Sequence, residues 1–205
     1  MSGPEEPSTG EEPEPVPERL DLELERVLVP RYGENPHQAA GVYRTVDGPG
    51  IFGGFAQHQG KELSYNNLLD ADAARRLVAG FARPPLDGPV VAIIKHNNPC
   101  GVGCGDSPAE AYERALECDP MSAFGSVVAS NRPADGALAE ALSKLFVEVV
   151  LAPAFETEAL EIFARKRNLR VLECPVEAAD AGLELRGIDG GCLAESPDGG
   201  PADTT

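Results

Sequence analysis

The sequence predicts an α/β fold with a mainly parallel sheet that is covered by helices on both faces. Two observations support this class. Short apolar runs such as PVVAII, residues 89–94, have the length and β-branching of buried strands. These runs alternate with stretches in which apolar residues recur at helical spacing. Strands that alternate with helices are typical of a parallel sheet, and ligands bind beyond the carboxyl ends of such strands.

The elements are predicted in chain order from these patterns and from helix-capping residues. The predicted strands are residues 26–30, 40–44, 89–94, 126–130, 146–151 and 169–173. Asn66 and Asn67 can cap a helix whose apolar residues continue to Phe81. Ser107 and Glu110 form a capping box with a proline at the first helical position, which starts a helix through Cys118. Two further helices are predicted near 134–144 and 156–166.

The two ends of the chain have a different composition from the middle. Residues 1–22 consist largely of Pro, Glu and Ser, and residues 188–205 are small and polar. Segments with so little apolar surface cannot offset the entropy cost of ordering. We therefore expect a disordered acidic tail at 1–22, one folded domain at 23–187, and a disordered tail at 188–205.

Charge and composition exclude several classes of function. The formal net charge is −17 and the sequence pI is near 4.5, so neither nucleic acid nor an anionic membrane is an expected partner. No apolar run is long enough for a transmembrane helix, and the N-terminus lacks the features of a signal peptide. Five cysteines in such a chain suggest reduced thiols and a cytoplasmic location.

Lys95 and His96 lie side by side where the apolar run 89–94 ends. In one interpretation a backbone carbonyl simply satisfies the histidine. In the other, the adjacent cation disfavours the imidazolium, so His96 is a neutral base near pH 7. Lys95 can then stabilise negative charge on an acyl oxygen.

Two polar segments precede this pair. RYGENPHQ, residues 31–38, is either a polar turn between strands or a cluster of donors suited to phosphate or carboxylate. GKELSYNNLLDADAA, residues 60–74, is interpreted first as the start of a well-capped helix, because capping explains Asn66 and Asn67.

PCGVGC, residues 99–104, is similar to the cysteine motif of zinc-dependent nucleobase deaminases. Those enzymes use P-C-x-x-C after an H-x-E motif. Here Cys100 and Cys104 are spaced C-x₃-C, and no H-x-E precedes them. We therefore expect no metal site.

Two more positions carry chemical information. Gly125 precedes the predicted strand at 126–130 and allows close approach of the backbone to a ligand. Glu148 interrupts the apolar run FVEVVLAP, where a carboxylate is costly unless it is paired or bonded to a ligand. The alternative for Glu148 is an edge strand that faces water.

Taken in order, five segments closely resemble the transformylase domain of the bifunctional purine-biosynthesis enzyme, AICAR formyltransferase joined to IMP cyclohydrolase. The segments are RYGENPHQ, GKELSYNNLLDADAA, IIKHNNPCGVG, AYERALECDPMSAFG and FVEVVLAPAFETEALEIF. The resemblance extends from about Leu28 to Glu173. It implies a cytidine-deaminase-like three-layer α/β/α unit without zinc.

The resemblance also implies roles for single residues. His96 is expected to be the proton acceptor, and Lys95 is expected to stabilise the transition state. The residues expected to bind the nucleotide are Arg31, Tyr32, Gly125 and Glu148.

The expected reaction is formyl transfer from 10-formyltetrahydrofolate to the 5-amino group of AICAR, in de novo IMP biosynthesis. The resemblance covers only the first half of the transformylase, so we expect a complementary chain or a homo-oligomer to complete the site. No ring-closing activity is expected. A non-catalytic nucleotide-binding or regulatory module and an inactive remnant remain as alternatives.

Overall fold

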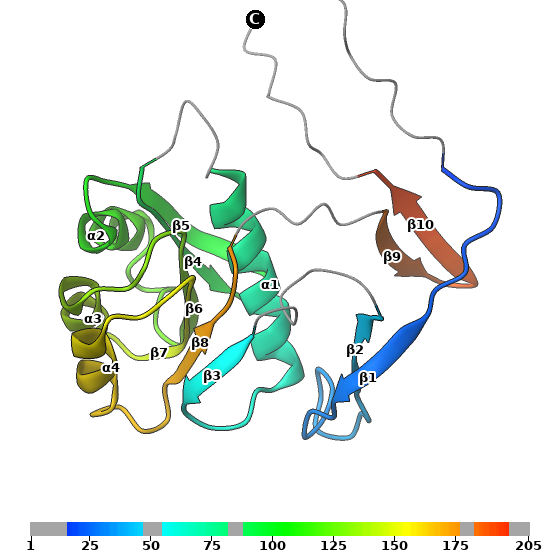
Figure 1. The fold of residues 1–205 in the computed structure, drawn as a ribbon, viewed down its shortest axis with the longest axis horizontal. Helices are drawn as coiled ribbons and strands as arrows, with labels where there is room; N and C mark the ends of the chain where they lie inside the picture. The colour runs from blue at the N-terminus through cyan, green and yellow to red at the C-terminus, as the bar shows by residue number, and fades with distance from the viewer. Residues whose placement is uncertain (1–15, 47–54, 82–87, 177–182, 197–205) are drawn as a thin grey trace, which may run out of the picture. The chain divides into compact units, whose positions relative to one another are not determined.

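The computed structural model describes residues 16–46, 55–81, 88–176 and 183–196. The chain divides into two compact units, Glu23–Ala179 and the two ends, Met1–Leu22 with Asp180–Thr205. The larger unit contains a sheet with helix α1 on one face and helices α2, α3 and α4 on the other (Figure 1). The predicted α/β class with three layers is therefore confirmed.

The main sheet of the larger unit has six strands in the order β3-β8-β7-β6-β4-β5. The strands are β3 (Ala56–Gln59), β4 (Val90–Lys95), β5 (Asn98–Cys104), β6 (Ser126–Ser130), β7 (Val147–Ala152) and β8 (Arg170–Glu173). Strands β6, β7 and β8 are parallel neighbours, and β5 runs in the same direction. Strands β3 and β4 run the opposite way, so the sheet is mixed although most of its strands share one direction.

Four helices begin at or near the predicted positions. They are α1 (Tyr65–Gly80), α2 (Pro108–Cys118), α3 (Gly136–Ser143) and α4 (Thr157–Phe163). Ser107 caps α2 as predicted, by accepting the Glu110 N–H at 3.2 Å. For α1 the N-cap is Ser64 and neither Asn66 nor Asn67, but Asn67 does take part in the cap: Ser64 accepts the Asn67 N–H, and the Asn67 side chain accepts the Ser64 N–H. An amide can take the place of Glu in a capping box because it too offers an acceptor oxygen.

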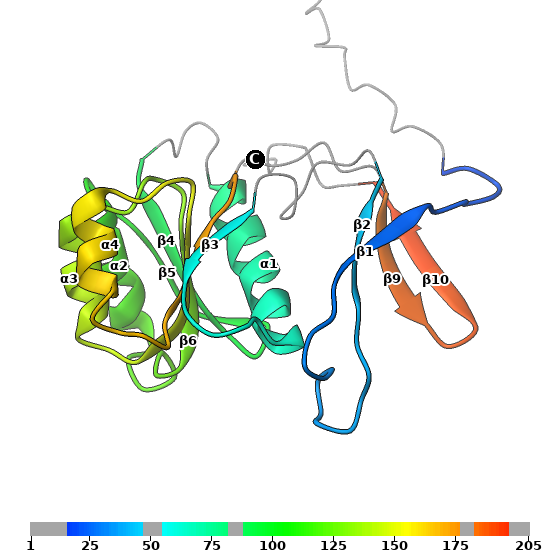
Figure 2. The same cartoon turned by 60° about the horizontal axis from the view of Figure 1, so that its bottom comes forward.

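Both faces of the sheet are buried, which explains the continuous apolar strands. Along β4, Val91 and Ile93 belong to the core beneath α2, α3 and α4, while Ala92 and Ile94 belong to the core beneath α1. In both views α1 stays on its own side of the sheet, opposite the other three helices (Figure 2). Alternate residues of one short strand therefore hold two helical layers in place.

Strand β5 was not predicted, and it explains the PCGVGC segment. A Cβ atom at Gly101 would lie 2.0 Å from the Ala115 carbonyl oxygen, and one at Gly103 would lie 2.2 Å from the Ala111 carbonyl oxygen. The glycines thus let α2 lie directly on β5. Cys100 packs against the core on the α2 side and Cys104 against the core on the α1 side, so the two thiols cannot share one ion.

Two antiparallel hairpins lie outside the main sheet. The predicted strands at 26–30 and 40–44 appear as β1 (Leu24–Leu28) and β2 (Val42–Thr45), which pair with each other in the larger unit. In the other unit, β9 (Glu184–Ile188) pairs with β10 (Gly191–Glu195). Their Asp189–Gly190 connection is a strong hairpin signal that outweighs the polar composition, so the structure differs from the expected disorder there. Of the two predicted tails, residues 1–15 and 197–205 lie outside the described residues.

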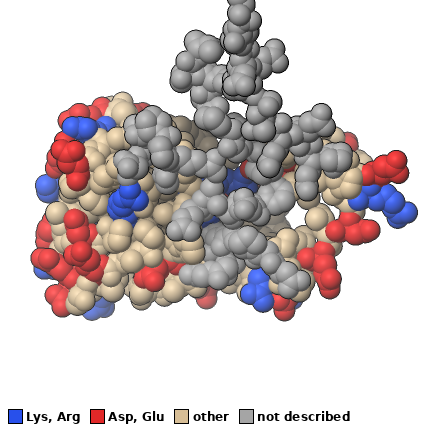
Figure 3. Space-filling model, turned by 45° about the horizontal axis from the view of Figure 1, so that its top comes forward, with Lys and Arg blue, Asp and Glu red and all other residues tan. Residues whose placement is uncertain are grey.

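The surface of the chain reflects its acidic composition. On the face drawn in Figure 3, Asp and Glu side chains are spread over the molecule with Lys and Arg side chains between them. Among the helices of the described ranges, none has the length and apolar character needed to cross a membrane.

Candidate functional site

Lys95 and His96 lie at the start of a tight hairpin that joins β4 to β5. Lys95 is opposite Asn98 in the register, so His96 and Asn97 form a two-residue turn. Both have positive φ, 51° for His96 and 62° for Asn97. A positive φ at both central residues is the requirement of a type I′ turn, and this conformation is uncommon for residues other than glycine.

The backbone of this turn is held by a carboxylate from helix α1. The Asn97 N–H donates to Asp70 Oδ1 at 2.6 Å, and the His96 N–H donates to Asp70 Oδ2 at 3.3 Å. The Asn98 side-chain amide closes the turn by donating to the His96 carbonyl oxygen at 2.8 Å. The sequence pattern suggests that His96 is the last residue of a strand. In the structure it is instead the first residue of a turn.

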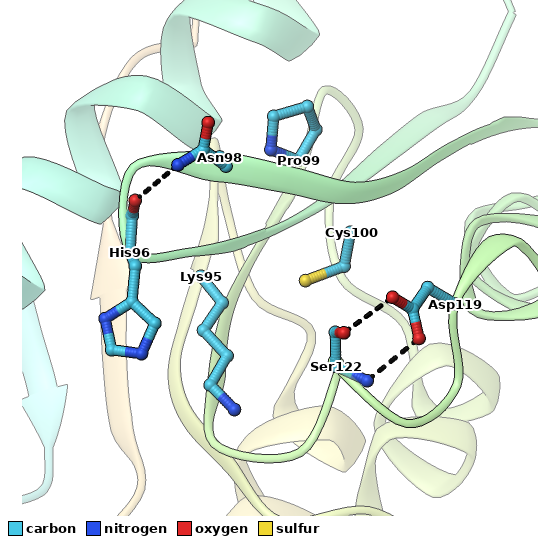
Figure 4. A pocket seen from close by; sticks show the side chains of 7 residues that line it. All are labelled: Lys95, His96, Asn98, Pro99, Cys100, Asp119 and Ser122. Carbon is cyan, nitrogen blue, oxygen red and sulfur yellow. Dashed lines mark hydrogen bonds between the residues drawn. The ribbon is translucent and has the colours of Figure 1, made fainter.

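The His96 imidazole is exposed and, within the described residues, forms no hydrogen bond. The interpretation in which a backbone carbonyl satisfies it does not hold in this structure. Figure 4 shows that the Lys95 and His96 side chains point in the same direction, although neighbouring residues of a strand normally point to opposite faces. The positive φ of His96 accounts for this change of direction.

The Lys95 ammonium group is oriented by the segment before β6. Its Nζ atom donates to the Phe124 carbonyl oxygen at 2.7 Å. That segment is itself held by Asp119, which accepts from the Ser122 N–H at 3.0 Å and from the Ser122 hydroxyl. The Ser122 hydrogen bonds are the main reason that the pKa of Asp119 is lowered from its usual value.

These groups surround an open hollow of about 340 Å³. Its lining residues are Lys95, His96, Asn98, Pro99, Cys100, Asp119 and Ser122 (Figure 4). Burial is the main cause of a raised pKa of the Cys100 thiol; the Asp119 carboxylate adds to it, and Lys95 opposes it. One wall of the hollow thus combines an ammonium group, an imidazole and a thiol that stays protonated near neutral pH.

The hollow lies at the end of the sheet opposite to the predicted one. In a parallel sheet ligands bind beyond the carboxyl ends of the strands, and Lys95 and His96 follow the predicted strand at 89–94. Because β4 is antiparallel to β6, its carboxyl end lies beside the amino ends of β6 and β7. A sequence pattern of apolar runs does not distinguish these two directions, so the prediction was wrong on this point.

Gly125 is the residue after Phe124, whose carbonyl oxygen accepts from Lys95. It has a φ of 78°, and its N–H donates to the Phe146 carbonyl oxygen at 2.7 Å. The rings of Phe124 and Phe146 are exposed and lie 5.1 Å apart, centroid to centroid, and Met121 is 89% exposed. An apolar surface therefore adjoins the hollow.

Glu148 lies at a β-bulge in β7, since the register passes from Ser126–Val147 to Val127–Val149. Its Oε2 accepts from the Asn67 side chain at 3.0 Å and lies 3.7 Å from the Arg170 guanidinium group. Strand β7 is between β6 and β8, so the edge-strand alternative is wrong. Glu148 is paired within the protein and is still partly exposed, at 39% of its side chain.

The RYGENPHQ segment connects β1 to β2 and is closed by its own hydrogen bonds. The Gly33 N–H donates to the Gln38 carbonyl oxygen at 2.9 Å, and the Asn35 N–H donates to the Gln38 side chain at 2.7 Å. The Arg31 guanidinium group lies 5.3 Å from the centre of the Tyr32 ring. Arg31 is exposed and Tyr32 is half-buried.

Helix α1 links these parts of the larger unit. Asn66 donates to the Glu34 carbonyl oxygen at 3.5 Å, Asn67 bonds Glu148, and Asp70 holds the His96 turn. Lys95 and His96 line one hollow, and Gly125 adjoins it through Phe124. Glu148 is connected to the same helix through Asn67, and the loop that carries Arg31 and Tyr32 is connected to it through Glu34, rather than to the hollow itself. The positioning roles of Asp70 and Asp119 were missed, although both residues lie inside the matched segments.

Among the described residues, no group of three or more His, Cys, Asp or Glu side chains is arranged to hold a metal ion. All five cysteines are free thiols.

Comparison with known proteins gives one clear result. A family model described as "AICARFT/IMPCHase bienzyme" matches residues 5–205. The bifunctional purine biosynthesis protein PurH of Polynucleobacter necessarius subsp. necessarius (strain STIR1) is 49% identical over 183 residues, which are 89% of this chain. PurH of Cutibacterium acnes (strain DSM 16379 / KPA171202) is 51% identical over 168 residues, which are 82% of this chain.

The match covers most of this chain but only about a third of each relative's own length. The chain spans 35% of the Polynucleobacter protein and 31% of the Cutibacterium protein. Among solved structures, Acinetobacter baumannii RibD (form 1) is 18% identical with a TM-score of 0.35, covering 52% of this chain and 34% of that chain.

Proposed function

The chain belongs to the AICARFT/IMPCHase bienzyme family, and on that premise we propose that the hollow beside Lys95 and His96 takes part in AICAR formyl transfer. In this reaction the 5-amino group of AICAR attacks the formyl carbon of 10-formyltetrahydrofolate. The transformylase motifs carry the resemblance, so the proposal concerns formyl transfer and not ring closure.

One observation carries the proposal: an unbonded imidazole and an oriented ammonium group point in the same direction from one turn (Figure 4). The amine of AICAR is a weak nucleophile because its lone pair delocalises into the ring. In the proposed step, the amine nitrogen bonds to the formyl carbon while His96 accepts the amine proton. The formyl C=O becomes an oxyanion, which Lys95 stabilises.

The tetrahedral intermediate then collapses by breaking its bond to N10 of the folate. That nitrogen takes up a proton, for which the imidazolium of His96 is the nearest donor in this scheme. A positioned general base contributes roughly 10²–10⁴ in rate, and a donor to the oxyanion contributes about 3 kcal/mol. These are the two contributions that this region of the chain is proposed to supply.

Arg31, Tyr32, Gly125 and Glu148 are proposed to bind the nucleotide. The Arg31 guanidinium group has no carboxylate partner within the described residues and is exposed, so it is available to an anionic ligand. Glu148 is partly exposed at its bulge, and Gly125 presents backbone beside Lys95. The surrounding charge is strongly negative, so local cations are needed to hold a phosphate.

The proposed reaction requires the folate co-substrate and no metal ion, since a proton acceptor and an ammonium group provide the chemistry. The exposed apolar surface of Met121, Phe124 and Phe146 adjoins the hollow. The remaining portion of the PurH relatives is proposed to complete the site, as a complementary segment or through a homo-oligomer. Free thiols at all five cysteines support a reducing compartment, so we place the reaction in the cytoplasm.

The test combines this chain with the portion of a PurH relative that it does not match. We expect formyl transfer to depend on both parts, because proximity of the donor supplies much of the acceleration. His96→Ala and Lys95→Leu should each lower the rate of the reconstituted mixture by about 10²-fold or more. His58→Ala, which removes another exposed histidine that is paired with Glu173 on the neighbouring strand, is the matched control and should leave the rate unchanged.

Nucleotide binding is measured separately by calorimetry on the reconstituted protein. Arg31→Ala should weaken AICAR binding by about 1.5–3 kcal/mol, the contribution of a charge-assisted contact. Arg44→Ala removes an exposed arginine paired with Glu25 and is the control. Full activity of the His96→Ala mixture would overturn the proposed mechanism. Nucleotide binding without turnover in any reconstituted mixture would instead indicate a binding module.

A further inference from the structure

We propose that Asp70 is a positioning residue: its carboxylate holds the His96–Asn97 turn in the left-handed conformation that aims the His96 imidazole into the hollow. This inference rests on the proposed role of His96 as the proton acceptor. Asp70 itself is not proposed to touch the substrate. It acts through two backbone N–H groups.

The first argument is the cost of the turn. Two consecutive non-glycine residues have positive φ, a conformation that costs free energy in residues with a side chain. It persists only when the surrounding structure determines it. A type I′ turn with His and Asn in place of Asn and Gly therefore needs external support.

The second argument is the quality of the support. A carboxylate that accepts two N–H groups forms charge-assisted hydrogen bonds, which are about twice as strong as neutral ones. The two bonds use different oxygens of Asp70, with the shorter one, 2.6 Å, to Asn97. The bidentate arrangement fixes both the position and the rotation of the turn.

The third argument is the rigidity of the helix that carries Asp70. On either side of it, Leu68, Ala71 and Ala74 are buried in the core between α1 and the sheet. The N-terminus of α1 is fixed by the Ser64–Asn67 capping box. The carboxylate is therefore presented from a fixed element, as a catalytic constellation requires.

A second explanation for any effect of Asp70 is its negative charge near the imidazole. Substitution at Asn97 distinguishes the explanation by turn geometry from the explanation by charge. Glycine adopts positive φ at little cost, and it is the preferred residue at the second central position of a type I′ turn. If Asp70 acts by holding the turn, Asn97→Gly should partly restore an Asp70→Ala variant; if it acts by its charge, no restoration is expected.

The structural experiment uses backbone NMR and amide hydrogen exchange on the 205-residue chain. In Asp70→Ala, the His96 and Asn97 amide signals should move and the protection of the Asn97 N–H should be lost. Asp70→Asn, which keeps one acceptor oxygen, should give an intermediate result. Asp72→Ala is the matched control, because it removes the same charge two residues along α1, where the carboxylate pairs with Arg76 at 2.9 Å.

The kinetic experiment uses the reconstituted formyl-transfer mixture. Asp70→Ala should lower kcat by about 10- to 100-fold, as small misplacements of catalytic groups do. KM for AICAR should not change, and Asp70→Ala with Asn97→Gly should recover part of kcat. Asp72→Ala should match the unsubstituted chain in both constants.

Unchanged His96 and Asn97 signals in Asp70→Ala would overturn the inference, whatever the activity. A moved turn with unchanged kcat would also overturn it, provided that His96→Ala abolishes activity in the same mixture. If His96→Ala is itself active, the proposed mechanism fails and the NMR result still decides whether Asp70 holds the turn.

Discussion

At the scale of single residues, the chemically informative side chains lie where regular structure is interrupted. His96 occupies a left-handed turn, and Cys100, Glu148 and His58 are each the extra residue of a β-bulge. A bulge changes the direction of a side chain relative to the alternation of the strand. This accounts for Cys100 facing the hollow although the pattern of β5 would not place it there.

The raised pKa of Cys100 leads to a prediction on thiol reactivity. Only the thiolate is nucleophilic, so at pH 8 Cys100 should react with iodoacetamide more slowly than the exposed Cys118 and Cys192. Cys174, which is buried and has a pKa of about 11, should react last. Peptide mapping by mass spectrometry gives the four rates.

Substitution of the two neighbouring charged residues, Asp119 and Lys95, tests the electrostatic part of the pKa shift of Cys100. The Asp119 carboxylate raises the pKa of Cys100, so Asp119→Asn should lower that pKa and speed alkylation of Cys100 a few-fold at pH 8. Lys95 lowers the pKa, so Lys95→Leu should slow alkylation. The difference between the variants should disappear at a pH above the pKa of the thiol. Slower alkylation in Asp119→Asn, or faster alkylation in Lys95→Leu, would contradict the electrostatic explanation.

At the scale of elements, the close contact between α2 and β5 depends on glycine. Gly103→Ala would place a methyl group against the backbone of α2, which cannot give way as a flexible side chain can. Overpacking of this kind typically costs about 1–3 kcal/mol. Urea unfolding should therefore show a lower free energy of unfolding for Gly103→Ala.

Gly80→Ala is the control for that substitution. Gly80 is the last residue of α1, and a Cβ atom there would meet nothing within 4 Å. Alanine is the better helix former, so this variant should be neutral or slightly more stable. A destabilisation of Gly80→Ala as large as that of Gly103→Ala would show that the loss does not come from the α2–β5 contact.

At the scale of the whole molecule, the net charge of −17 opposes compactness through self-repulsion. The ion pairs of Arg44, Arg76, Arg114 and Arg165 are at the surface, and such pairs contribute little to stability. Screening by salt should therefore weaken the repulsion among the excess carboxylates more than it weakens the attraction within the surface ion pairs.

We accordingly expect Tm to rise by a few degrees between low salt and about 0.2 M NaCl, where the Debye length falls below about 10 Å. Differential scanning calorimetry gives the shift. Potassium chloride should have the same effect at equal ionic strength, because screening depends on charge and not on the identity of the ion. A fall of Tm with salt would mean that attractive pairs dominate.

The sequence by itself determined the α/β class, the four helices and most of the main strands. Their signals are local: β-branched apolar runs at 90–94 and 126–130, and the Ser107 cap followed by proline. It also identified the matched family and singled out Lys95 and His96 as candidate catalytic residues, since both steps depend on residue order alone.

Only the tertiary structure decided the direction of β4, the end of the sheet at which the hollow lies, and the roles of Asp70 and Asp119. Strand direction depends on pairing between distant segments, and an apolar run reads the same in either direction. Asp70 lies 26 residues before His96 and accepts from its backbone N–H, so no local pattern links the two. Strand β5 escaped prediction for the same reason: its glycines weaken the strand signal locally, and only the packing of α2 against them explains why they are there.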